Sequence, residues 1–131
     1  MGKDKPKMIT ICGSSRFIEH MAVLGWLLEK EEGAIVMGLN YLPHWYGADP
    51  DHQGEKEGVA EAMDELHLRK IDISDEIFVV DVDRYIGRST KREIEYAEQQ
   101  GKVIRLYSCE ELGRKIEHMY DDYLKSKGPV V

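Results

Sequence analysis

A strand, a loop and a helix follow one another in Ile77-Phe-Val-Val-Asp-Val-Asp-Arg-Tyr-Ile-Gly-Arg-Ser-Thr-Lys-Arg-Glu93-Ile-Glu-Tyr-Ala97. The apolar run Ile-Phe-Val-Val is typical of a strand buried on both faces, as in parallel sheets. Open parallel sheets bind ligands just beyond the carboxyl ends of their strands. We therefore expect a functional edge at the residues that follow the strand, which are Asp81, Asp83, Gly87, Ser89, Thr90 and Glu93.

The rest of the chain alternates between apolar runs and segments with helical spacing of apolar residues. We expect strands at 8–12, 34–37, 77–82 and 103–107, and helices at 17–33, 55–73, about 90–100, and one last helix with Leu112, Ile116, Met119 and Tyr123 on one face. This alternation predicts an α/β fold, a three-layer Rossmann- or flavodoxin-like parallel sheet of four to five strands with helices on both faces. A fifth strand would come from the 38–54 connection. We expect one domain over 1–131, with a polar tail at 1–7.

Charge and composition exclude several classes of function. The net charge of −7 argues against binding of nucleic acid polymers or anionic membranes. No segment approaches the roughly 20 apolar residues of a membrane span. The two cysteines have no metal-ligand spacing, which fits a cytoplasmic protein with no cofactor or metal.

The 38–54 connection is long and rich in aromatic residues. We interpret His44, Trp45 and Tyr46 as a stacking wall for a flat ligand or as contacts of a dimer. A calcium loop starting at Asp49 fails at its twelfth position, where Ala60 replaces the required glutamate. We therefore expect no metal site in this loop.

Two glycine-containing loops have side chains that suit a phosphate group. Gly13-Ser14-Ser15-Arg16 opens a helix, where free N–H groups favour an anion, although Ser14 or Ser15 can equally serve as an ordinary N-cap. The second loop is Gly87-Arg88-Ser89-Thr90. Neither is a dinucleotide fingerprint or a P-loop.

Thr90 and Glu93 have the spacing of a capping box, which is a purely structural device. Ser108 and Glu111 repeat this spacing, so spacing alone does not indicate function. The place of Glu93 after a central strand favours a catalytic carboxylate. We expect it in the first helical turn, where the helix dipole keeps it ionised, as a nucleophile requires.

Further acids and basic residues surround this segment. Asp81 and Asp83 point to the same side of an extended strand, where Asp81 can support Glu93. His67, Arg69, Lys70 and Asp72 precede the strand, and we expect them on a solvated helix face.

The motifs Ile11-Cys-Gly-Ser-Ser-Arg16 and Ser89-Thr-Lys-Arg-Glu93 resemble those of the nucleoside 2-deoxyribosyltransferase-like family. Within it, the chain is most similar to deoxynucleoside 5'-monophosphate N-hydrolases and their small bacterial and phage relatives. The resemblance implies that Glu93 attacks C1' of the sugar and forms a glycosyl-enzyme ester. It also implies a nucleotide substrate, no cofactor and a homodimer or higher homo-oligomer.

Two departures from the family pattern leave an alternative open. Thr10 stands where relatives often carry an aromatic hydroxyl, and Lys70 or Asp72 stands nearest to a family aspartate. If Asp72 fills that role, the catalytic set is Glu93, Asp81 and Asp72. If it does not, the chain is alternatively a non-catalytic nucleotide-sensing module of the same fold.

Overall fold

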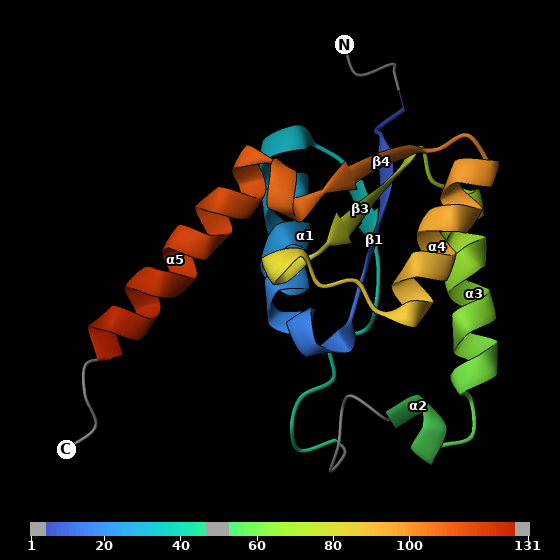
Figure 1. The fold of residues 1–131 in the computed structure, drawn as a ribbon, viewed down its shortest axis with the longest axis horizontal. Coiled ribbons are helices and arrows are strands. Elements are labelled where there is room, and N and C mark those ends of the chain that lie inside the picture. Colours follow the sequence, from blue (N-terminus) through green and yellow to red (C-terminus); the bar gives the residue numbers. More distant parts are fainter. Residues whose placement is uncertain (1–4, 47–52, 128–131) are drawn as a thin grey trace.

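The computed structural model describes residues 5–46 and 53–127 and confirms the α/β three-layer architecture. Within these residues a parallel sheet of four strands has the order β2-β1-β3-β4 (Figure 1). The strands are β1 (Met8–Gly13), β2 (Ile35–Met37), β3 (Glu76–Val80) and β4 (Val103–Leu106). No fifth strand forms in the described parts of the 38–54 connection.

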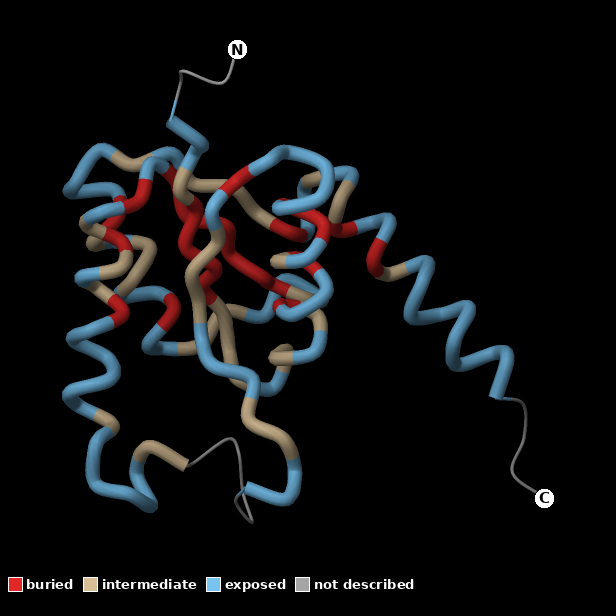
Figure 2. The backbone as a smooth tube through the Cα atoms, turned by 180° about the vertical axis from the view of Figure 1, so that it is seen from behind, coloured by how far each residue is buried: buried red, intermediate tan, exposed pale blue. Residues whose placement is uncertain are grey.

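Helices cover both faces of the sheet. One face packs against α1 (Ile18–Glu32) and α5 (Glu111–Lys127), and its core includes Ile9, Ile11, Phe78 and Val80. The other packs against α3 (Ala60–Asp72) and α4 (Arg88–Gln99), with Cys12, Ile77 and Val79 in its core. Every residue of β3 is buried, as its apolar sequence predicts, and the strands form the buried centre of the molecule (Figure 2).

Three elements differ from the predictions by two residues or more at one boundary, and the other boundaries agree to within about one residue. The expected helix over 55–73 is divided into α2 (Gln53–Lys56) and α3, and Gly58 between them has a φ of 74°. β3 ends at Val80 instead of residue 82, because the chain turns at Asp81 into the short helix η3 (Val82–Arg84). α4 begins at Arg88, two residues before the predicted start.

Helix α5 projects away from the body of the molecule (Figures 1 and 2). Its first turns bury Gly113 and Ile116. Met119 and Tyr123, on the predicted apolar face, are 42% and 53% exposed. The apolar face of this helix is therefore covered only near its start. None of the described helices is long and apolar enough to cross a membrane.

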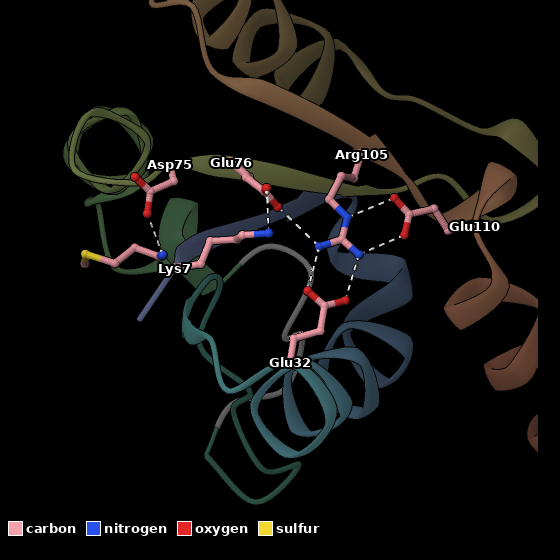
Figure 3. A network of polar contacts seen from close by, with 7 residues as sticks. Lys7, Glu32, Asp75, Glu76, Arg105 and Glu110 are labelled. Carbon is pink, nitrogen blue, oxygen red and sulfur yellow. Dashed lines mark hydrogen bonds and ion pairs between the residues drawn. The ribbon is translucent and has the colours of Figure 1, made fainter. Parts of the chain in front are cut away.

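An ion network joins β4 to helix α1 (Figure 3). Arg105 makes a two-pronged contact with Glu32 at 3.0 and 2.8 Å, and also contacts Glu76 and Glu110. Lys7 adds a 3.0 Å ion pair with Glu76. Arg105 thus offsets the mutual repulsion of several carboxylates at low solvent exposure.

We expect Arg105→Met to lower the free energy of unfolding by about 2 kcal/mol, because it leaves neighbouring carboxylates without their shared cation. Arg105 holds the pKa of Glu32 below its usual value. The stabilisation is therefore present above the ordinary pKa and is lost as the pH falls through the lowered one. Urea denaturation at neutral and acidic pH measures both effects.

Arg114→Met is the matched control, because among the described residues Arg114 forms an ion pair only with exposed Glu111, one turn away. Its expected change is within about 0.5 kcal/mol. Equal effects of the two substitutions would contradict the importance of the network.

Candidate functional site

Glu93 lies in the second turn of α4, and the predicted capping box does not form. Gly87 is the N-cap residue, and Thr90 is a buried residue inside the helix. At the second site with this spacing, Ser108 donates its hydrogen bonds to Asp81. The structural explanation for the Thr90–Glu93 spacing is therefore wrong, and so is our placement of Glu93 in the first turn.

Three side chains from separate elements converge at the carboxyl ends of the central strands. Cys12 Sγ from β1 lies 3.5 Å from His67 Nε2 of α3. The same nitrogen lies 3.7 Å from Glu93 Oε1 of α4. The three ligand-type atoms all lie within 4.8 Å of one another. We call this set the Cys12–His67–Glu93 cluster. His67 is 3% exposed, so its predicted place on a solvated face is wrong.

Burial dominates the electrostatics of the cluster. Desolvation raises the pKa of Glu93 to about 7, with a further contribution from the negative charge of Asp64. Burial, followed by the repulsion from Lys70, lowers the pKa of His67 to about 4. Burial, followed by the charge of Glu93, raises the pKa of the Cys12 thiol. Our expectation that the helix dipole keeps Glu93 fully ionised is therefore wrong, because Glu93 lies beyond the first turn, where the dipole acts, and burial raises its pKa.

The cluster does not have the arrangement of a cysteine hydrolase. In such enzymes a base contacts the nucleophile through one ring nitrogen and an orienting group through the other. Here Cys12 and Glu93 both face Nε2 of His67, and Nδ1 is buried without a partner in the described structure. The raised pKa of Cys12 also keeps its thiol protonated. Glu93 is thus the better candidate for a nucleophile.

A second acid approaches Glu93 from α3. Asp64, Leu68, Ser89 and Arg92 line a cavity of about 10 Å³ together with Glu93. That volume holds about one water molecule. Glu93 and Asp64 therefore form a pair of carboxyl groups at a small opening, one partly buried and one exposed.

The acids predicted beside Glu93 have other partners. Asp81 accepts hydrogen bonds from the backbone N–H and hydroxyl of Ser108, at 2.8 and 2.7 Å. Asp72 accepts one from the hydroxyl of Tyr96 and forms an ion pair with Arg69. Within the described residues the structure brings neither acid into contact with Glu93.

The positions that differ from the family pattern are also occupied by structural contacts. Thr10 is buried and its hydroxyl lies 2.6 Å from that of Ser74. Lys70 donates a hydrogen bond of 2.7 Å from Nζ to the carbonyl of Gly38. Both side chains therefore hold neighbouring segments together.

The first predicted phosphate loop contacts the segment that leads into the second. Ser14 caps η1 (Ser15–Phe17) by accepting a hydrogen bond from the Arg16 N–H. The Arg16 guanidinium stacks at 4.1 Å on the ring of Tyr85, in the loop before α4, and donates to its hydroxyl. Gly13 faces Val80, where a Cβ would lie 3.1 Å from the carbonyl oxygen. The contact between Arg16 and Tyr85 joins the first loop to the segment before α4, and a Cβ at Gly87 in the second loop would lie 3.4 Å from the same Tyr85 hydroxyl.

The remaining predicted binding residues are exposed. Arg88 and Ser89 form the exposed start of α4 behind Gly87. In the 38–46 segment His44 is exposed and Trp45 is 82% exposed, while Tyr46 donates a hydrogen bond to Glu57. Asp49, where the rejected calcium loop would begin, lies outside the described residues.

Sequence reasoning missed Cys12, His67, Asp64 and Tyr85 as site residues. For Cys12 the sequence did contain a signal, because this residue immediately precedes the first predicted phosphate loop. For His67 and Asp64 no local signal exists, because only the packing of α3 against α4 brings them to Glu93.

Comparison of this chain with protein-family models, curated proteins and solved structures found no significant match.

Proposed function

We propose that this protein is an N-glycosidase that cleaves, or transfers, the base of a nucleoside 5'-monophosphate. The observation that carries the proposal is the pairing of the partly buried carboxyl of Glu93 with the exposed carboxyl of Asp64 at one opening. Retaining glycosidases use two such groups, one as nucleophile and one as acid and base. No Lys or Arg among the described residues neutralises Glu93 in an ion pair, which favours function over a structural role.

The proposed reaction has two displacements. In the reactive form the two carboxyl groups hold one proton between them, on Asp64, and Glu93 is ionised. Glu93 attacks C1' as the bond from C1' to the base nitrogen breaks, and the departing base takes this proton from Asp64. Asp64 then removes a proton from water, which attacks C1' and releases Glu93. A second base in place of water would give transfer. Our assignment of the acid to Asp64 rests on the shared cavity, which neither Asp72 nor Asp81 lines.

The substrate phosphate is proposed to bind between the two predicted phosphate loops, 13–16 and 87–90. Arg88 and Ser89 are exposed at the start of α4, and no ion pair of Arg88 forms with the described residues. Free N–H groups at this helix start favour an anion. These groups supply local positive charge in an acidic protein.

We also propose a cytoplasmic homodimer. Tyr120 and Leu124 of the projecting helix are exposed next to Met119 and Tyr123, which is unusual for a monomer surface. Both cysteines are free thiols, as a reducing compartment permits.

A panel of deoxyribo- and ribonucleoside 5'-monophosphates tests the activity. The chelator-treated protein is incubated with each nucleotide, and the released base is followed by chromatography. We expect release from at least one nucleotide and slower release from the matching nucleoside, which lacks the phosphate. The absence of base release across the panel would overturn the proposal.

A second candidate is a nucleotide-sensing module without chemistry. The observation that favours it is the size of the opening at Glu93, about 10 Å³, which does not admit a sugar. If this candidate is correct, a nucleotide should raise the melting temperature of the protein and no base should be released.

A further inference from the structure

The geometry of the Cys12–His67–Glu93 cluster matches the coordination shell of a metal ion. A tetrahedral zinc ion with bonds of about 2.0–2.3 Å places neighbouring ligand atoms about 3.3–3.6 Å apart. The distances from His67 Nε2 are 3.5 Å to Cys12 Sγ and 3.7 Å to Glu93 Oε1. The Cys12 sulfur and the Glu93 oxygen lie within 4.8 Å of each other. A thiol, an imidazole and a carboxylate therefore surround one point, and the two distances from His67 are near the required spacing.

Hydrogen bonding accounts for only part of this convergence. The protonated Cys12 thiol can donate to the Glu93 carboxylate, and this interaction holds the pKa of Glu93 down against the effect of burial. His67 Nε2 carries at most one proton, so it can donate to only one of its two neighbours. The separation of 3.7 Å from the Glu93 oxygen is longer than a hydrogen bond. Burying a carboxyl and an imidazole with such weak contacts is costly. A cation between them would offset that cost.

The surroundings of the cluster favour a site with an open position. Its three side chains are held by β1, α3 and α4, so the ligands stand on regular elements. The small cavity beside Glu93, which neither Cys12 nor His67 lines, holds about one water molecule next to this ligand. Mixed sulfur, nitrogen and oxygen donors suit Zn²⁺ better than Mg²⁺ or Ca²⁺, which prefer oxygen.

We propose that Cys12, His67 and Glu93 bind one Zn²⁺ ion. Binding requires the Cys12 thiolate, neutral His67 and ionised Glu93, so the protons of Cys12 and Glu93 leave to solvent as the metal enters. Because a coordinated Glu93 cannot attack C1', zinc inhibits base release; this second consequence rests on the proposed function.

Cobalt substitution tests the site directly. Metal-free protein is titrated with Co²⁺, which reports tetrahedral coordination through visible bands and thiolate coordination through a near-ultraviolet charge-transfer band. We expect one equivalent to give both signals and Zn²⁺ to displace it. Cys12→Ser should remove the charge-transfer band and weaken Zn²⁺ binding at least about tenfold. Cys109→Ser is the matched control, since Cys109 is exposed and outside the cluster, and should change neither.

His67→Gln and Glu93→Gln provide independent variants if Cys12→Ser does not fold. Each should weaken Zn²⁺ binding, and circular dichroism verifies the fold. Absence of stoichiometric binding, or full binding by all three variants, would overturn the inference. If base release persists while no metal binds, only the zinc inference fails. If one equivalent binds and no nucleotide is cleaved under any condition, only the proposed function fails.

Discussion

Glu93→Gln is expected to lower the rate of base release at least about 10³-fold, because the amide cannot act as the nucleophile. The fold should persist, since Gln has nearly the same shape and the wild-type pKa of about 7 already leaves much of Glu93 uncharged near neutral pH. Rates are compared at pH 8 with a chelator present, where most of the wild-type carboxyl is ionised. Chromatography of the released base measures both proteins.

Glu95→Gln is the control for this substitution. It lies on the same helix and is exposed, so its rate should match the wild type. Asp64→Asn should lower the rate about 10²-fold, as expected for loss of a general acid. If Asp72→Asn lowers the rate of base release more than Asp64→Asn does, then Asp72 and not Asp64 is the general acid. A Glu93→Gln protein as active as Glu95→Gln would contradict the mechanism.

Gly113→Ala is expected to destabilise the protein by at least about 3 kcal/mol. A Cβ at this position, in the first turn of α5, would collide with the backbone carbonyl group of Tyr107. Backbone atoms cannot give way as a flexible side chain can, so α5 would have to move off the sheet. Urea denaturation followed by circular dichroism measures the change.

Gly25→Ala tests the same exchange at a position where the structure has space for a Cβ atom. Its Cβ would lie 3.6 Å from Val36 Cγ1 and 3.7 Å from Ile11 Cδ1, which are ordinary contacts. Because Gly25 lies inside α1, the exchange should stabilise the protein by about 0.5–1 kcal/mol. Destabilisation by both substitutions to the same extent would contradict the steric explanation.

The fold was predictable because local patterns determine it. The apolar run that begins at Ile77 predicted a strand buried on both faces, and Gly33 predicted the end of α1. The boundary errors have local physical causes. Asp81 turns the chain out of β3 through its hydrogen bonds to Ser108, a partner 27 residues away that no local pattern reveals.

The candidate site was predictable only in part. The place of Glu93 near the carboxyl edge follows from the strand that precedes it. Its ionisation does not, because burial against Cys12 and His67 depends on how three separate elements pack. The contact between Arg16 and Tyr85 joins residues 69 positions apart, so no local sequence pattern could predict it.

The claim that Glu93 is the nucleophile is tested most directly by capturing its ester. A 2'-fluoro-arabino analogue of a cleaved nucleotide slows breakdown of the intermediate, because fluorine destabilises the oxocarbenium-like transition state. We predict that the intact mass rises by one sugar phosphate and that fragmentation of tryptic peptide 93–102 places it on Glu93. Base release from this analogue with the sugar phosphate attached to another residue would contradict the account.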